Sequence, residues 1–306
     1  MRILSAADLI DALPYIVLTQ DLPALMLRKT ESPQRHVYSV RQKGEPDASL
    51  LLMPAWTAGV GGVKIVNVTP GNGARGLAAV TASYLVFNAV TGEHLALMDG
   101  GELTARRTAA VAAVAADRLA VPGARKLLVV GSGRIASELP FAYRAVRNIS
   151  EVAVYSPTRI NAEALARRLA DNGFTARVCD DLESGVSQAD IIACASLSHH
   201  PLVRGDWLRP GQHVALIGGY TPDMREADDA AMKRCRIWVD GHGALSEAGD
   251  LVGPLSHGVL RYEDILGTLA DLCAVSDVVD RETTVTLFKS VGDAAQDLAA
   301  AAIAMK

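Results

Sequence analysis

The chain has 306 residues, of which 50% are hydrophobic and 21% are charged, and its formal net charge is −4. This length predicts two domains, and the composition excludes disorder, collagen and coiled coil as the dominant state. The mildly acidic balance argues against a protein that binds nucleic acid through a basic face.

The N-terminus lacks the basic start and the continuous apolar run of a signal peptide. No stretch approaches ~20 uninterrupted apolar residues, so we expect no membrane span. The four cysteines lie far apart, without a Cys-x-x-Cys pair or zinc spacing. We therefore expect a cytoplasmic protein with reduced, buried cysteines and no metal.

The first third of the chain predicts a mixture of helix and strand. Residues 5–18 form an amphipathic pattern with Ser5 as the helix cap. The other elements expected here are strands at 50–54 and 63–68, a loop at 70–76, a hairpin of 84–88 with 94–98, and a long alanine-rich helix at 103–119. This helix is expected to join the two domains.

From residue 124 the pattern becomes a regular alternation of strand and helix. Strands are expected at 126–130, 151–155, 176–179, 190–196, 213–218, 236–239 and 283–288. Helices are expected from the first glycine turn to about 146, at 161–171, at 263–274 and from 293. Apolar strands separated by helices imply a parallel sheet that is covered on both faces.

The segment Gly131-Ser132-Gly133-Arg134-Ile135-Ala136 follows an apolar strand and precedes a helix. The first glycine permits a tight turn, the second lets the backbone approach a pyrophosphate, and the small Ala136 lets helix pack on strand. A lone Gly-x-Gly-x-x-Ala is also compatible with a merely structural turn. The surrounding strands and helices favour dinucleotide binding.

The end of the second strand indicates which dinucleotide is bound. An NAD site usually carries an acid there for the ribose 2′-hydroxyl, whereas this chain has Ser156, Thr158 and Arg159. Arg159 offers paired hydrogen bonds to a 2′-phosphate, with Arg134 as a second cation. We therefore predict NADPH as the cofactor, with NADH possible. The alternative is that Arg159 is a solvated residue at a helix start.

Several segments resemble the ornithine cyclodeaminase/μ-crystallin family, and they run in family order from about residue 35 to the C-terminus. They include Gly62-Val63-Lys64-Ile65-Val66, Asn72-Gly73-Ala74-Arg75-Gly76-Leu77, Leu103-Thr104-Ala105-Arg106-Arg107-Thr108-Ala109-Ala110, Phe288-Lys289-Ser290-Val291-Gly292 and Gln296-Asp297-Leu298. Within the family, the segments Leu139–Arg147, Pro201–Gly205 and Thr221–Asp229 look most like the bacterial ketimine reductases. These reduce Δ1-pyrroline-2-carboxylate and Δ1-piperideine-2-carboxylate to L-proline and L-pipecolate.

The resemblance implies an α/β fold: a Rossmann doubly wound parallel sheet at 119–285, plus an α+β domain formed by both chain ends. This second domain, 1–118 plus 286–306, would bind a small cyclic imino acid and pair two subunits into a homodimer.

The resemblance also assigns roles to single residues. Arg35, Lys64 and Arg107 match the positions that bind the substrate carboxylate, and a lysine within an apolar strand is unexpected unless it has a role. The imine nitrogen must carry a proton for hydride transfer, so either the substrate arrives protonated or Lys64 donates the proton. The residues expected to contact the cofactor are Thr81, Arg107, Thr108, Gly131, Gly133, Arg134, Ile135, Ala136, Ser156, Thr158, Arg159, Ser196, Gly218 and Ser290.

The chain departs from the cyclodeaminase pattern at two positions. Tyr220 replaces the aspartate that follows the glycine pair, and Leu51 replaces a glutamate near the first strand. A tyrosine is a poor general base at neutral pH, although Asp223 or Glu226 could substitute for the missing acid. The main prediction is an imine reductase. The alternatives are an ornithine cyclodeaminase, an alanine-dehydrogenase-like enzyme, or a non-catalytic NADPH-binding protein like μ-crystallin.

Overall fold

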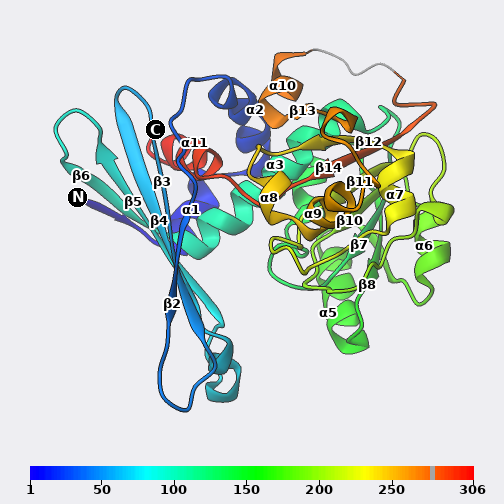
Figure 1. Ribbon diagram of the computed structural model, residues 1–306, viewed down its shortest axis with the longest axis horizontal. Coiled ribbons are helices and arrows are strands. Elements are labelled where there is room, and N and C mark those ends of the chain that lie inside the picture. The colour runs from blue at the N-terminus through cyan, green and yellow to red at the C-terminus, as the bar shows by residue number, and fades with distance from the viewer. Residues whose placement is uncertain (276–279) are drawn as a thin grey trace. The chain divides into compact units, whose positions relative to one another are not determined.

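The computed structural model describes residues 1–275 and 280–306, which form two compact units (Figure 1). Unit 1 contains residues 1–107 and 293–306, and unit 2 contains residues 108–292. These boundaries differ from the expected ones, 118/119 and 285/286. The difference arises because the last expected strand pairs within the sheet of unit 2 and the second half of the long helix belongs to that unit.

Unit 1 is built on a six-stranded sheet of order β1-β6-β5-β4-β3-β2. Its strands are β1 (Arg2–Leu4), β2 (His36–Val40), β3 (Ala48–Trp56), β4 (Val60–Val68), β5 (Val80–Asn88) and β6 (His94–Asp99). Only β1 pairs in parallel, and the others form antiparallel neighbours. The expected 84–88/94–98 hairpin is present, and the expected loop at 70–76 contains the 3-10 helix Pro70–Arg75.

The expected helix over 5–18 is two helices, α1 (Ala6–Ala12) and α2 (Tyr15–Met26). The break falls at Pro14, whose ring removes a backbone donor and restricts the preceding residue. Ser5 caps α1 as predicted, because its hydroxyl accepts from the Asp8 N–H at 3.3 Å. Among the described residues no single helix is long and apolar enough to cross a membrane; α1 and α2 meet that test only together, as a pair bent by 76°.

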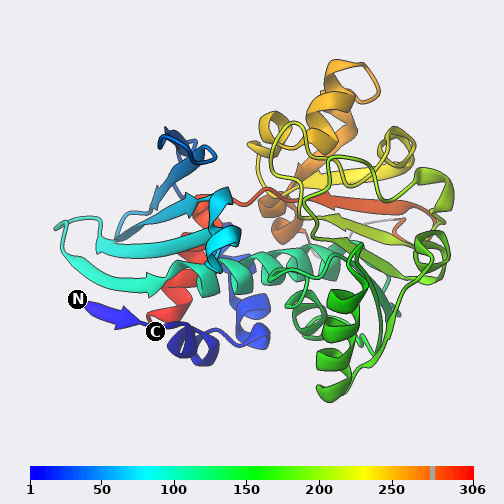
Figure 2. The same ribbon diagram turned by 90° about the horizontal axis from the view of Figure 1, so that it is seen from below.

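One face of the unit 1 sheet is covered by helices. The C-terminal helix α11 (Ala294–Ala304) packs Ala294 and Leu298 against Met53 and Ala55 of β3, and Figure 2 shows α1 and α11 on the same side of the strands. Side chains alternate along each strand, so residues 53, 55, 62, 64, 84, 86, 96 and 98 share this covered face and are buried.

The opposite, outer face of the same sheet carries apolar side chains that are only half-buried. We define the outer face by Leu50, Leu52, Pro54, Val63, Ile65, Leu85, Phe87, Leu95 and Leu97. No helix of the described part of unit 1 packs over these residues. Apolar side chains that share one face of a sheet and stay half-exposed make that face a candidate interaction surface.

Unit 2 contains an all-parallel eight-stranded sheet of order β13-β12-β14-β11-β10-β7-β8-β9. Its strands are β7 (Lys126–Val130), β8 (Glu151–Tyr155), β9 (Thr175–Val178), β10 (Ile191–Cys194), β11 (His213–Leu216), β12 (Cys235–Val239), β13 (Ile265–Thr268) and β14 (Val285–Lys289). The order reverses between β7 and β10, which is the doubly wound arrangement that was expected. Ligands of such sheets bind outside the carboxyl ends of the strands near this switch point.

Helices flank this sheet. They are the C-terminal half of α3 (Gly100–Leu119), α4 (Leu139–Arg144), α5 (Arg159–Asp171), α6 (Leu182–Gln188), α7 (Asp229–Arg234), α8 (Ala244–Glu247), α9 (Gly249–Ser256) and α10 (Leu269–Ala274). The expected helix over 263–274 is wrong in its first half. Ile265–Thr268 instead pairs with β12 as the edge strand β13, and α10 begins after Thr268, whose side chain accepts from the Asp271 N–H.

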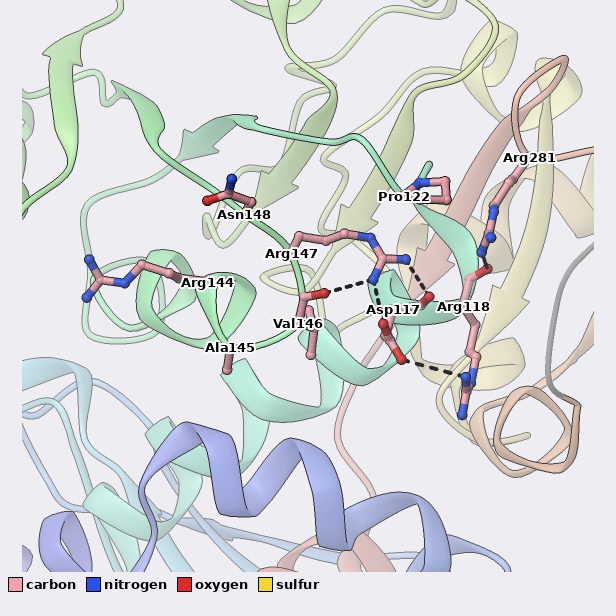
Figure 3. Close-up of a pocket in the computed structure, with 9 residues that line it drawn as sticks. All are labelled: Asp117, Arg118, Pro122, Arg144, Ala145, Val146, Arg147, Asn148 and Arg281. Atoms are coloured by element: carbon pink, nitrogen blue, oxygen red, sulfur yellow. Dashed lines mark hydrogen bonds and ion pairs between the residues drawn. The ribbon is translucent and has the colours of Figure 1, made fainter.

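Arg147 satisfies the carbonyls at the end of α3. Its guanidinium donates to the Asp117 side chain and carbonyl and, at 3.1 Å, to the Ala120 carbonyl. A shallow pocket of about 700 Å³ lies beside these contacts (Figure 3). Its other arginines are also bonded: Arg144 to the Asn172 carbonyl, Arg281 to the Arg118 carbonyl. Arg147 and Arg281 thus bond to the end of α3 and Arg144 to the residue after α5, and these cations do not converge on one point in the pocket.

Candidate functional site

Three charged side chains from distant parts of the chain meet on the covered face of unit 1. Lys64 lies in the middle of β4, Arg107 on α3, and Asp297 on α11. Lys64 and Arg107 are each 3% exposed and Asp297 is fully buried. Burying charges is costly unless they are paired, so the arrangement depends on the contacts among them.

Asp297 bridges the two cations. Its Oδ2 lies 2.8 Å from Lys64 Nζ, and its Oδ1 accepts from Arg107 Nε at 2.7 Å. Arg107 Nη1 also donates to Gln296 Oε1 at 2.9 Å. The remaining nitrogen of Arg107, Nη2, makes no hydrogen bond to any residue that the structure describes. Asp297 and Gln296 thus hold Arg107 through two of its three guanidinium nitrogens.

The charges set the protonation of the cluster. Burial lowers the pKa of Lys64 to about 8; Asp297 opposes this shift, whereas the positive charges of Arg107 and Arg35 add to it. Burial alone would raise the pKa of Asp297, but Arg107 and Lys64 outweigh it and hold that pKa below its ordinary value. Near neutral pH the acid is ionised, while the lysine is poised to exchange its proton.

The structure brings two of the three predicted substrate residues into contact with one acid and leaves the third nearby. Arg35, in the segment before β2, is half-buried and close enough for its charge to act on Lys64. We call Arg35, Lys64 and Arg107 the cation cluster. Lys64 and Arg107 together carry one positive charge more than Asp297 neutralises.

The role of Asp297 as the partner of Lys64 and Arg107 was not predicted from the sequence, although its segment is among those that resemble the family. The available signal is an acid flanked by Leu298 and alanines in an otherwise apolar helix, which requires a partner if that helix is buried. Tyr84 was also missed. It lies opposite Lys64 in the β4–β5 register, and its buried hydroxyl contacts the space that a side chain on Gly62 would fill.

Thr81, a predicted cofactor residue, does not join this cluster. It is exposed on β5, three residues before Tyr84, and strand alternation directs it to the opposite face of the sheet from Lys64. Thr108 is buried on α3 directly after Arg107.

The glycine turn of unit 2 has the geometry of a phosphate-binding turn. Gly131 has φ +127°, a conformation that favours glycine, and a side chain there would collide with the Ala195 carbonyl. The space next to Gly133 is open. In the part of the chain that the structure describes, the N–H groups of Gly133 and Ile135 donate to no acceptor. Free amides at this turn fit a pyrophosphate, while Ala136 is buried where the turn meets the sheet.

The residues after β8 include those that the sequence predicts to select between NAD and NADP. Ser156 Oγ lies 2.9 Å from Ser132 Oγ and accepts from the Thr158 N–H. Arg159 is two-thirds exposed and pairs with Glu163 at 2.8 Å and with Asp180 after β9. Arg134 similarly pairs with Glu138. Both predicted phosphate-binding arginines are therefore accessible but already carry acidic partners.

Three further predicted residues lie at the carboxyl ends of neighbouring strands. Ser196 follows β10, Gly218 follows β11 and Ser290 follows β14. Buried acids hold all three: Glu226 accepts from Ser196 and Gly218, and Asp240 accepts from the Ser290 hydroxyl at 2.8 Å. The parallel sheet thus collects the glycine turn and these strand ends along one edge.

The two positions that depart from the cyclodeaminase pattern carry no acid in this structure. Leu51 lies on the covered face of β3 and Tyr220 is partly buried in the loop after β11. Of the possible substitutes, Asp223 is exposed and lies 3.0 Å from His199 Nδ1, while Glu226 uses both oxygens to hold backbone amides. Neither is a free buried base.

Comparison with known proteins agrees with this geometry. The profile of the ornithine cyclodeaminase/mu-crystallin family matches residues 17–305. A Delta(1)-pyrroline-2-carboxylate reductase from Paracoccus denitrificans is 38% identical over 259 residues, covering 83% of this chain and 82% of the relative.

Solved structures extend the similarity to the whole chain. The Delta(1)-pyrroline-2-carboxylate reductase of Thermococcus litoralis, in complex with NADH and L-proline, is 30% identical, with a TM-score of 0.93 over 99% of this chain and 96% of that chain. An archaeal alanine dehydrogenase dimer with bound NAD is 28% identical, with a TM-score of 0.90 over 99% of this chain and 94% of that chain. The resemblance found in the sequence is thereby confirmed, and the chain belongs to the ornithine cyclodeaminase/mu-crystallin family.

Proposed function

We propose that this chain reduces the cyclic ketimines Δ1-pyrroline-2-carboxylate and Δ1-piperideine-2-carboxylate to L-proline and L-pipecolate, with hydride added at C2. At a coarser level its relatives make it an oxidoreductase that acts on imines with a nicotinamide dinucleotide. The observation that carries the proposal is the cation cluster, in which the buried Lys64 and Arg107 share one acid and the Arg35 charge acts on Lys64.

The charge of the cluster supports a small carboxylate as the ligand. Lys64 and Arg107 carry one positive charge more than Asp297 neutralises, and Arg107 Nη2 is available for a charge-assisted hydrogen bond. A diamino acid also needs an acid for its second amine, and the positions of Leu51 and Tyr220 supply none. This favours a substrate that is already cyclised over L-ornithine.

Lys64 supports the protonation that imine reduction requires. With a pKa of about 8, it is mostly protonated at neutral pH and still able to give its proton to a substrate nitrogen. Asp297 would then stabilise the cluster by holding Lys64 and Arg107 in place. We propose Lys64 as the proton donor and Arg35, Lys64 and Arg107 as the carboxylate-binding residues.

We propose NADPH as the preferred dinucleotide, with NADH accepted. When bound, the dinucleotide supplies the hydride. Gly131, Gly133 and Ile135 would hold its pyrophosphate, and Arg159 would hold a 2′-phosphate in exchange for part of its pairing with Asp180. The absence of a carboxylate directly after β8 supports this preference.

We also propose that two copies pair through the outer face of unit 1, because its half-buried apolar residues have no cover within that unit. An alanine dehydrogenase of similar fold is a dimer, which agrees with this proposal. The free cysteines support a reducing compartment such as the cytoplasm.

The substrate proposal is tested by following the oxidation of NADPH and of NADH with Δ1-pyrroline-2-carboxylate and Δ1-piperideine-2-carboxylate. Parallel reactions contain L-ornithine with NAD, assayed for ammonia, and pyruvate with ammonia and NADH. We expect oxidation with the cyclic imines, faster with NADPH, and no ammonia from L-ornithine. Ammonia release, turnover confined to pyruvate, or dinucleotide binding without any turnover would each contradict the proposal.

A further inference from the structure

Unit 2 contains a buried group of charges behind the ends of β10 and β11 that the proposed chemistry does not use. Glu226 comes from the segment before α7, Asp250 from α9 and Lys289 from the last position of β14. All three side chains are fully buried. Because burial of charge is costly, each of them needs a partner inside the fold.

Glu226 ties together the ends of two neighbouring strands. Its Oε1 accepts from the N–H and the hydroxyl of Ser196, at 2.7 and 2.8 Å, and its Oε2 accepts from the Gly218 N–H at 2.9 Å. A side chain at Gly218 would lie 2.6 Å from Glu226 Oε1 and would also collide with Ser196. One carboxylate therefore fixes the spacing of the β10 and β11 ends.

Asp250 and Lys289 in turn hold Glu226. Asp250 Oδ1 accepts from the N–H groups of Glu226 and Ala227, at 2.8 and 3.1 Å. Asp250 Oδ2 lies 2.9 Å from Lys289 Nζ. A side chain built on Gly219 would lie 3.2 Å from Asp250 Oδ2 and 3.4 Å from Lys289 Nζ, so the loop that leads to Tyr220 packs directly on this ion pair.

We propose that Lys289 is a positioning residue that acts through Asp250 and Glu226 to hold the Ser196–Gly218 edge in the form that receives the nicotinamide half of the dinucleotide. This inference rests on the proposed function, since it assumes that the edge binds a nicotinamide dinucleotide. Lys289 pairs with Asp250, and its positive charge counteracts the rise that burial gives to the pKa of Glu226.

The charged groups around Glu226 affect whether it stays ionised, and its ionisation controls the hydrogen bonds that hold the Ser196–Gly218 edge. Burial raises the pKa of Glu226, Lys289 on β14 counteracts that rise, and Asp250 on α9 adds to it. Cys194 on β10 also senses the Glu226 charge, and Arg225 Nε lies 4.0 Å from Asp250 Oδ1. Without the Lys289 charge, Glu226 takes up a proton more readily. A protonated carboxyl no longer accepts from both Ser196 and Gly218, and the edge loosens.

The test measures dinucleotide binding by fluorescence titration of the purified protein with NADH, without substrate, at about pH 6.5 and about pH 9. NADH is used because it lacks the 2′-phosphate, which itself titrates. In Lys289→Met we expect affinity to fall about tenfold at the lower pH and much less at the higher pH, because Glu226 regains its charge there. The matched control is Lys126→Met, which removes an exposed lysine at the start of β7, the end of that strand away from the glycine turn. This variant should leave the affinity unchanged.

The double variant Lys289→Met with Asp250→Asn separates charge from packing. It restores the net charge of the group, so its affinity at the lower pH should recover toward that of the unsubstituted protein. A Lys289→Met protein with a pH-independent affinity, or a double variant that binds more weakly than the single one, would overturn the inference. Should Lys289→Met not fold, Glu226→Gln replaces it: affinity should fall about tenfold at both pH values, and unchanged affinity would overturn the inference. If the unsubstituted protein binds neither NADH nor NADPH, the proposed function fails instead.

Discussion

Asp297 determines what Lys64 and Arg107 offer to a ligand. Without this acid, two neighbouring buried cations would repel each other and the lysine would lose its proton more easily. With it, Lys64 keeps a pKa of about 8 and Arg107 keeps a fixed orientation through two hydrogen bonds. The pair is therefore held in place within the chain itself, as the proposed carboxylate site requires.

The first residue-scale prediction concerns pH. If protonated Lys64 is the donor, kcat/KM for imine reduction falls as pH rises above about 8, roughly tenfold per pH unit, because the active form loses its proton there. Lys64→Arg retains its charge in this range and should lack this decline, at a lower overall rate. The measurement is the pH profile of kcat/KM for both proteins. An identical alkaline decline in Lys64→Arg would exclude Lys64 as its origin.

At the same scale, Lys64 could be predicted from the sequence, whereas its pairing with Asp297 could not. Lys64 is conspicuous because it interrupts an apolar strand. Asp297 lies 190 residues from Arg107 along the chain, and no local pattern reports a pairing across that separation. The cofactor contact of Thr81 stays a prediction; strand alternation places this residue on the other face of the sheet from Lys64.

At the scale of the elements, the parallel sheet of unit 2 was predictable because each of its central strands is an apolar run between helices. The edge strands were harder. Residues 265–268 carry a spacing that suits a helix, and only their pairing with β12 makes them β13. The strands β1 and β2 are also short or exposed edge strands, and neither was predicted from the sequence.

A hydrogen-bonded chain in unit 2 joins β11 and β14 to the end of α3. Thr286 Oγ1 donates to the Leu119 carbonyl at 3.0 Å, so it accepts from His213 Nδ1, which lies 3.0 Å away. The other ring nitrogen of His213 is buried without a hydrogen-bond partner among the described residues. This histidine is therefore neutral in the folded protein, and burial lowers its pKa from 6.5 to about 3.

This element-scale contact predicts acid sensitivity. Between about pH 6.5 and about pH 3 the unfolded chain binds a proton at His213 that the folded chain does not. The free energy of unfolding therefore decreases as the pH is lowered, by up to about 1.4 kcal/mol per pH unit. We expect His213→Asn to be less stable at neutral pH and to lose less stability on acidification. Urea unfolding midpoints at several pH values test this. His94→Asn, at an exposed position on β6, is the control, and an equal acid loss in His213→Asn would contradict the assignment.

At the scale of the whole molecule, the outer face predicts the assembly. Ile65→Lys places a charge among half-buried apolar side chains, so pairing through this face should be lost. Light scattering coupled to size-exclusion chromatography should give twice the mass of the chain for the unsubstituted protein and the mass of one chain for Ile65→Lys. Val90→Lys, at an exposed tip between β5 and β6, should remain paired. A dimeric Ile65→Lys protein would contradict pairing through the outer face.

In a homodimer with a two-fold axis, the same face of both copies forms the interface. In a two-fold assembly every substitution appears twice, and a side chain near the axis meets its own duplicate. A new charge at the centre of the outer face therefore cannot be matched by an opposite charge at the same position, as it can between two different proteins. Variation among homologues that pair in this way should exchange apolar residues of different size across the face, while sign-matched charges should appear only toward its rim.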